Sequence, residues 1–146
     1  MQMNGIAHIV INVTNMDVCR NFYKPLFEFL EMRLIYDTDD MMYGVGSRTG
    51  LLVRAATAEF SNERYSQHRA GLHHFCFRAR SREDIDALHE FLLSIDATIV
   101  HGPESGSWAP GYYSVLFEDP EGIRIEANHV PGKGNLADGI ELPLKG

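Results

Sequence analysis

The chain has 146 residues, 45% of them hydrophobic and 23% charged, which is typical of one folded domain or two small modules. Its net charge of −7 argues against non-specific binding to nucleic acid, and no apolar run approaches the roughly 18–20 residues of a membrane span. The amino terminus lacks the basic start and the cleavage site of a signal peptide. Because Cys19 and Cys76 both lie in apolar patterns, we expect free buried thiols and a cytoplasmic location.

The first half of the chain reads as a strand, a helix and three further strands. Polar and apolar residues alternate over Ala7–Val13, which indicates a half-buried strand. Thr14 or Asn15 is then a suitable cap for a helix, although Pro25 should kink or break it. Three strand-like segments follow, with the sequences MRLIYD, MMYGVGS and GLLVRAA.

The same order of elements returns after a polar linker at residues 58–71. The segment LHHFCFRAR indicates a strand, and Ser81 followed by Asp84 indicates a capped helix. Three more strands are predicted in the segments ATIVHG, GYYSVLFED and GIRIEAN.

This repeat predicts an α+β fold with two βαβββ modules. Side by side, the modules would form one curved, cup-shaped mixed sheet with the helices on its convex side. We expect a single domain at residues 1–130, with modules at about 5–57 and 72–130, and a carboxy-terminal tail at 131–146 that wraps the surface or is mobile.

Three polar residues share one face of these predicted strands. His8, His74 and Glu126 each alternate with apolar neighbours that belong beneath the helices, so all three should point to the opposite face. Two imidazoles and a carboxylate form a ligand set for a divalent metal such as Fe, Mn, Zn, Ni or Co. The alternative is that each is an ordinary solvated or hydrogen-bonded side chain. His73 has the opposite parity, and we interpret it as structural.

The chain resembles the vicinal oxygen chelate superfamily, the glyoxalase/bleomycin resistance/dioxygenase group. The resemblance rests on HIVINV leading into NFYKPLFEFLEM, then HHFCF, and above all FEDPEGIRIE. It spans roughly Ile6 to Asn128 and implies paired βαβββ modules around a metal, with His8, His74 and Glu126 at the ligand positions. It also implies a homodimer, because many members build each cup from two chains.

One feature of the glyoxalase-type pattern is missing. Those members have a fourth ligand, Glu or Gln, on the last strand of the first module, where this chain has Val53 or Arg54. Because that carboxylate also moves protons in the glyoxalases, lactoylglutathione lyase activity is not expected. A three-ligand set is closer to extradiol dioxygenases and fosfomycin-type resistance transferases.

Several further residues are candidates for substrate binding or proton transfer. Arg124 has the parity of Glu126 and could hold an anionic group, unless it forms an ordinary surface ion pair. The loop HGPESGSWAPGYY could cover the substrate, or it could be a plain connection. The proposed substrate contacts are Arg124, Trp108 and Asn128, and the general acid or base would be His101, Tyr112 or Tyr113, with His101 and Tyr113 preferred.

These observations favour a divalent-metal-dependent, glyoxalase-like enzyme with isomerase or lyase chemistry on a small oxygenated metabolite. The metal would stabilise an oxyanion or enolate. Two alternatives remain: a metal-free, bleomycin-resistance-like protein that binds a small molecule, and an extradiol-type dioxygenase. We expect no nucleic-acid or membrane partner.

Overall fold

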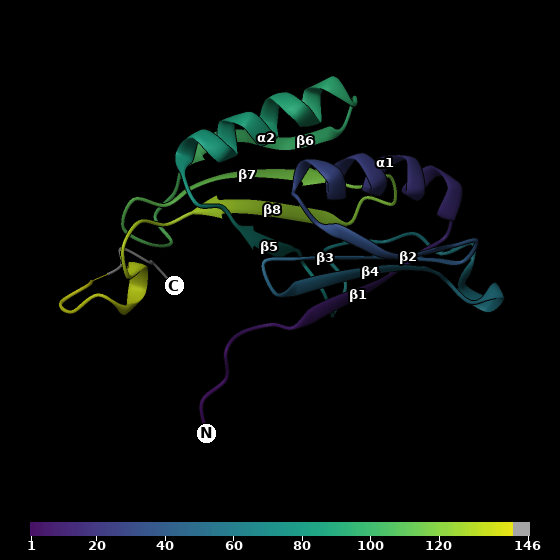
Figure 1. The fold of residues 1–146 in the computed structure, drawn as a ribbon, viewed down its shortest axis with the longest axis horizontal. Coiled ribbons are helices and arrows are strands. Elements are labelled where there is room, and N and C mark those ends of the chain that lie inside the picture. Colours follow the sequence, from purple (N-terminus) through teal and green to yellow (C-terminus); the bar gives the residue numbers. More distant parts are fainter. Residues whose placement is uncertain (142–146) are drawn as a thin grey trace. The chain divides into compact units, whose positions relative to one another are not determined.

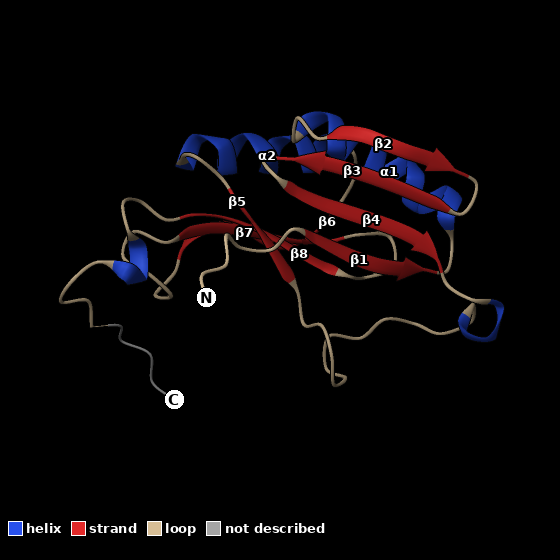
Figure 2. Cartoon of the chain, turned by 60° about the horizontal axis from the view of Figure 1, so that its bottom comes forward, coloured by secondary structure: helices blue, strands red, loops and turns tan. Residues whose placement is uncertain are grey.

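The structure is a computed structural model that describes residues 1–141, so the end of the expected tail at 131–146 lies outside the described residues. The chain forms two compact units, Met1–Tyr65 and Ser66–Gly146. Each contains one helix and a four-stranded sheet, and the helix lies on one face of its own sheet (Figures 1 and 2). The predicted α+β class and the βαβββ repeat are therefore confirmed.

The first unit has the strand order β1-β4-β3-β2. Strand β1 runs parallel to β4, and the other two pairs are antiparallel. Its elements are β1 (His8–Val13), α1 (Met16–Phe29), β2 (Arg33–Thr38), β3 (Met41–Gly46) and β4 (Thr49–Ala55).

The second unit repeats this topology as β5-β8-β7-β6, with β5 parallel to β8. Its elements are β5 (Phe75–Arg78), α2 (Arg82–Ser94), β6 (Thr98–Ser105), β7 (Tyr113–Glu118) and β8 (Arg124–His129). Short 3-10 turns occupy Ala58–Phe60 and Gly134–Leu136. The first lies in the segment that the sequence predicts to be a linker.

Both helices begin at the caps that their sequences predict. The Asn15 side chain accepts a hydrogen bond from the Val18 backbone N–H at 3.1 Å. Ser81 and Asp84 form a reciprocal capping box, which satisfies two backbone N–H groups at the start of α2. Helix α1 continues through Pro25 to Phe29, so the proline does not break it.

The core of each unit lies between its helix and the covered face of its sheet. Alternate strand residues point toward the helix, as the period of two predicts. In the first unit Phe27 of α1 packs against Gly44 of β3, where a side chain would overlap its ring. In the second unit Ile85 and Leu88 of α2 are buried with the β7 and β8 residues of the covered face, Val115, Phe117, Ile125 and Ala127. The opposite faces of both sheets therefore carry the side chains available for binding.

Within residues 1–141, no helix has the length and apolar character needed to cross a membrane.

The turn between β7 and β8 is organised by a buried carboxylate. One oxygen of Asp119, whose side chain is buried, accepts hydrogen bonds from the Glu121 N–H at 2.9 Å and the Ile123 N–H at 2.8 Å. The Gly122 N–H bonds to the Asp119 carbonyl at 2.9 Å, and Gly122 has a positive φ of 83°. This turn sets where β8 begins, and hence which residues of β8 face away from α2.

Asp119→Ala should destabilise the protein by about 2–4 kcal/mol, because it leaves two backbone N–H groups without their acceptor in a buried turn. Asp119→Asn keeps a side-chain oxygen and should cost less, about 1 kcal/mol. Urea unfolding followed by circular dichroism measures both. Equal stability of the alanine variant and the wild type would show that the turn does not depend on this carboxylate.

Candidate functional site

The strand pairing of the second unit places a row of side chains on the face away from α2. Cys76 of β5 lies beside Glu126 of β8, Glu126 lies beside Leu116 of β7, and Leu116 lies beside His101 of β6. Directly paired residues in neighbouring strands point to the same side of a sheet. Glu126 therefore stands in the middle of the uncovered face, as its sequence parity predicts.

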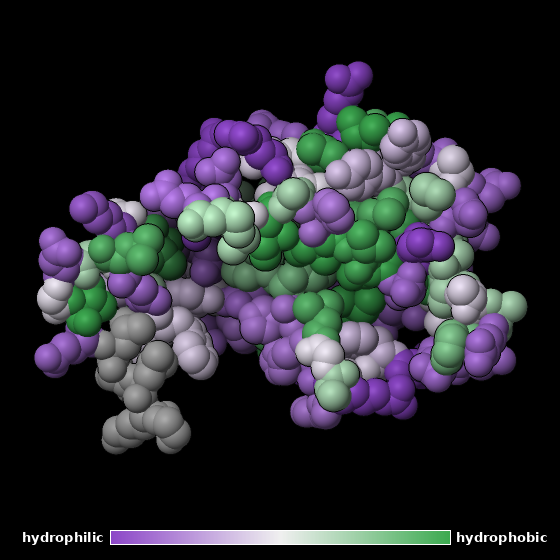
Figure 3. Space-filling model, turned by 90° about the horizontal axis from the view of Figure 1, so that it is seen from below, coloured by the Kyte–Doolittle hydropathy of each residue, from purple (hydrophilic) through white to green (hydrophobic). Residues whose placement is uncertain are grey.

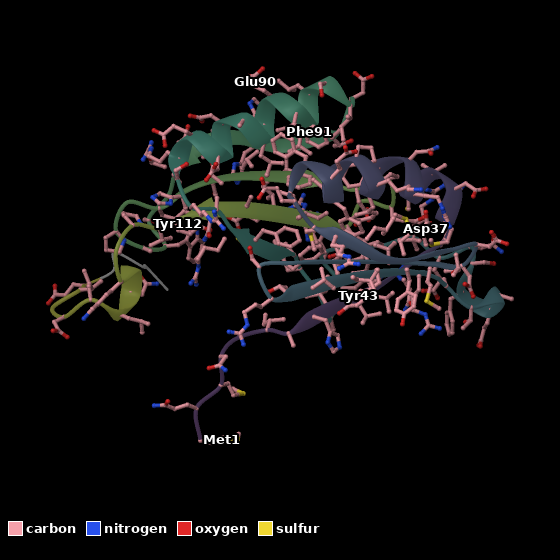
Figure 4. The ribbon with its side chains drawn as sticks, in the orientation of Figure 1. Met1, Asp37, Tyr43, Glu90, Phe91 and Tyr112 are labelled. Carbon is pink, nitrogen blue, oxygen red and sulfur yellow. The ribbon has the colours of Figure 1, made fainter. Side chains whose placement is uncertain are left out.

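Glu126 is buried even though it lies on this uncovered face, with only 9% of the residue exposed. The Tyr112 hydroxyl donates a hydrogen bond of 2.5 Å to its Oε1. The other oxygen, Oε2, lies 3.0 Å from His74 Nε2. Tyr112 comes from the residue before β7 (Figure 4) and His74 from the residue before β5. Both carboxylate oxygens are thus held by side chains from the ends of other strands.

His74 has a second partner that the sequence parity does not predict. Strand β5 begins at Phe75, so the alternation of a strand does not apply to the two preceding histidines. His73 Nδ1 lies 2.8 Å from His74 Nδ1, and the rings meet edge to face with their centroids 5.0 Å apart. The expectation that His73 faces the opposite way from His74 is corrected by this contact.

The His74 and Glu126 side chains are suitable as two ligands of one metal ion. Two donors at roughly 2.1 Å from a metal, at a right angle, lie roughly 3 Å apart. The Nε2–Oε2 distance of 3.0 Å fits that spacing. Within the described residues, no group of three or more His, Cys, Asp and Glu side chains gathers as a metal site. The second unit by itself therefore offers two donors, His74 and Glu126.

In the first unit, the equivalent face keeps a histidine, His8, but has a leucine in place of the carboxylate. His8 lies beside Gly50, and Val10 lies beside Leu52. Because Val10 corresponds to Cys76 in the repeat, Leu52 corresponds to Glu126. The sequence-based estimate of Val53 or Arg54 for this position is thus off by one or two residues. Leucine has no donor atom, so the absence of a fourth ligand here is unchanged.

A tyrosine lies across the sheet next to His8. A Cβ atom built on Gly50 would come within 3 Å of the Tyr43 ring, so the ring occupies the space of the missing side chain. Val10 is 47% exposed and Tyr36, which stacks on Tyr43, is 59% exposed. Figure 3 shows hydrophobic side chains gathered on this side of the molecule. The free face of the first unit is therefore apolar next to His8, while Asn12 and Arg54 lie further along the same face.

The three predicted substrate contacts have different surroundings. Arg124 Nε lies 3.3 Å from Glu118 Oε1, so this guanidinium forms the ion pair that was its alternative reading. Asn128 is half-buried on the Glu126 side of β8 and lies beside Ser114. Trp108 is 62% exposed in the loop between β6 and β7, and its carbonyl accepts a bond from Asn135.

The two preferred acid–base candidates lie on opposite faces of the sheet. His101 is half-buried on the Glu126 side, two strands away and hence about 10 Å from it. Tyr113 has the opposite parity, and its hydroxyl donates to Asp86 of α2 at 2.7 Å, with Arg82 stacked 3.8 Å from its ring. Of the two adjacent tyrosines, Tyr112 is the one that reaches Glu126.

The Glu126 carboxylate changes the acidity of its neighbours. Desolvation and the hydrogen bond to Glu126 raise the pKa of Tyr112 well above its ordinary value. Cys76 is free, and it is exposed at the sheet surface, unlike the buried Cys19. The expectation that both cysteines are buried is thus wrong for Cys76. Partial removal of its sulfur from water, and then the negative charge of Glu126, raise the pKa of the Cys76 thiol to about 12.

Metal-free protein should therefore react slowly with iodoacetamide at pH 8.5, where an ordinary thiol is about half thiolate. Glu126→Gln removes the nearby charge, lowers the Cys76 pKa and should increase the rate several-fold. Mass spectrometry of the alkylated protein reports the rate at Cys76, and Cys19 should stay unmodified because it is fully buried. A glutamine variant as slow as the wild type would contradict the electrostatic contact between Cys76 and Glu126.

Comparisons with known proteins agree with this architecture. The family model of the Glyoxalase/Bleomycin resistance protein/Dioxygenase superfamily matches residues 5–127. A relative in Bacillus subtilis (strain 168), the uncharacterized protein YqjT, is 25% identical over 122 residues, which cover 82% of this chain and 94% of the relative.

Solved structures show the same fold. A candidate glyoxalase from Bacillus halodurans has a TM-score of 0.74 at 24% identity and covers 87% of this chain and 96% of its own. Lactoylglutathione lyase from Agrobacterium tumefaciens has a TM-score of 0.64 at 20% identity, with 88% and 96% covered. By its repeat and by the match over most of its length, this chain belongs to the Glyoxalase/Bleomycin resistance protein/Dioxygenase superfamily.

Proposed function

We propose that this protein is a divalent-metal-dependent, glyoxalase-like enzyme with isomerase or lyase chemistry on a small oxygenated metabolite. His74 and Glu126 would be ligands from the second unit, and His8 would be the third. The observation that carries the proposal is the 3.0 Å approach of His74 Nε2 to Glu126 Oε2, with the other Glu126 oxygen held by Tyr112. His8 is included because it has the position of His74 in the repeat and points to the uncovered face of its own sheet.

The donor types are those of a transition-metal site. Imidazole and carboxylate suit Fe, Mn, Zn, Ni and Co, and three protein ligands leave positions for water or substrate. When bound, such an ion supplies Lewis-acid stabilisation of an oxyanion or enolate. The protein's own contribution is to fix the carboxylate: Tyr112 holds Oε1, so that Oε2 alone faces the proposed metal position.

Proton transfer would fall to a side chain other than a ligand. Leu52 stands where a fourth ligand would be and has no proton to exchange. His101 is on the Glu126 face, about 10 Å away across two strands, a distance that a small substrate spans. Its Nδ1 lies 2.9 Å from the Gly102 carbonyl, so Nε2 is the nitrogen available to a substrate. We assign the acid–base role to His101, and we assign Tyr113 to the packing of α2.

Substrate binding would combine charge and apolar surface. Arg124 is held by Glu118, so an anionic substrate group would have to compete with that carboxylate. Asn128 and the exposed indole of Trp108 are the further candidates for contact with substrate. We propose a homodimer, as the family resemblance implies, and no nucleic-acid or membrane partner.

A metal-free binding protein is the second candidate, and one observation favours it. His74 and Glu126 satisfy each other without any ion, and the free face of the first unit offers the apolar side chains Val10, Leu52 and Tyr43. Such a protein would bind an apolar or aromatic small molecule and would tolerate substitution of the proposed ligands.

Metal content separates these two functions. Untagged protein exposed to Ni²⁺, Zn²⁺, Mn²⁺ or Fe²⁺ and then desalted should retain about one ion per chain by elemental analysis. His8→Ala, His74→Ala and Glu126→Ala should each lose most of it, because each removes one of three ligands.

His68→Ala is the matched control, because His68 is an exposed histidine of the second unit that contacts Gln67 and none of the proposed ligands. Failure of the wild type to retain any of these ions would overturn the enzyme proposal and leave the binding protein. If the His74 and Glu126 variants lose the metal ion while His8→Ala retains it fully, His8 is not a ligand and the other two assignments stand.

A further inference from the structure

We infer that His73 and Tyr112 are positioning residues for the metal ligands, one at each end of a chain of four side chains joined by close polar contacts. The chain runs from His73 to His74, then to Glu126 and finally to Tyr112. Its contacts measure 2.8 Å, 3.0 Å and 2.5 Å in that order. The inference rests on the proposed function, since it concerns ligands of the proposed metal.

His73 would set the tautomer and the ring orientation of His74. A histidine that binds metal through Nε2 must carry its proton on Nδ1, and that N–H needs an acceptor. His73 Nδ1, at 2.8 Å, stands where the acceptor is required. A neutral imidazole accepts through one nitrogen while the other keeps the proton. The edge-to-face contact of the two rings also restricts rotation of His74.

Tyr112 would fix the orientation of Glu126. Its hydroxyl takes Oε1, so rotation of the carboxylate would break a short hydrogen bond in a buried place. The tyrosine is itself held in place, because its carbonyl accepts a hydrogen bond from the Gly106 N–H and its ring packs closely against Gly106. The loop between β6 and β7 is thereby coupled to the proposed ligand.

Two pairs of neighbouring residues, His73 with His74 and Tyr112 with Tyr113, allow the inference to be tested with matched variants. His73 neighbours a proposed ligand, and Tyr112 neighbours Tyr113, whose hydroxyl donates to Asp86 on the α2 side. Removing the hydroxyl at 112 should therefore affect metal binding, while the same change at 113 should not. At position 73, asparagine keeps an acceptor on a side chain of similar reach, whereas phenylalanine keeps only the ring.

The test measures metal affinity of the full chain by competition of Zn²⁺ with a chromophoric chelator. His73→Phe and Tyr112→Phe should each weaken binding by about 10–100-fold, the usual effect of removing a partner of a metal ligand. His73→Asn should stay within a few-fold of the wild type, and His68→Ala and Tyr113→Phe should match it. Circular dichroism checks folding, and His73→Ala replaces the phenylalanine variant if that variant does not fold.

A second readout separates positioning from a general structural effect. In Zn²⁺-loaded protein, nitrogen-15 NMR should show His74 protonated at Nδ1, with slow exchange in the wild type and faster exchange in His73→Phe. Unchanged affinity in both His73→Phe and Tyr112→Phe would overturn the inference and leave the proposed function intact. A wild type that binds no metal would overturn both.

Discussion

The arrangement of the free face of the second unit depends on the partners of one buried carboxylate, that of Glu126. A charged group removed from water is costly unless hydrogen bonds or an opposite charge compensate for it. Glu126 is nine-tenths buried, and its two oxygens are satisfied by Tyr112 and His74. These residues precede β7 and β5, so a single side chain on β8 ties together the beginnings of two other strands. The Asp119 turn in turn sets the start of β8.

The two units share a topology but differ in the chemistry of their free faces. Positions that correspond in the repeat carry Val10 and Leu52 in the first unit and Cys76 and Glu126 in the second. The first face has one exposed histidine next to apolar groups, with Asn12 and Arg54 further along the strands, and the second has a connected set of polar groups. An internal repeat thus preserves the backbone while the side chains at equivalent points diverge, which places most of the proposed chemistry in one copy.

The sequence predicts the fold well because its signals are local. Strand alternation and the Asn15 and Ser81 caps each depend on neighbouring residues, and all occur in the structure. The face of Glu126 follows from the same alternation. The prediction for His73 is wrong because it applies strand alternation to a residue that precedes the strand, which begins only at Phe75. The contact of Tyr112 with Glu126 could not be predicted, because the sequence alone does not show which of the adjacent residues Tyr112 and Tyr113 faces Glu126 and which faces α2.

The contact between His74 and Glu126 gives the proposed site a definite relation between its metal-free and metal-bound forms. Without a metal, His74 Nε2 and Glu126 Oε2 contact each other directly at 3.0 Å. A metal ion would have to replace the direct contact between the two donors, so part of its binding free energy would be spent in breaking that contact. The outer contacts to His73 and Tyr112 use other atoms, Nδ1 and Oε1, and need not break. In the proposed site both ligands would therefore be oriented before a metal binds. The inner contact would be replaced, and the contact to His73 would have the His74 Nδ1–H as its donor.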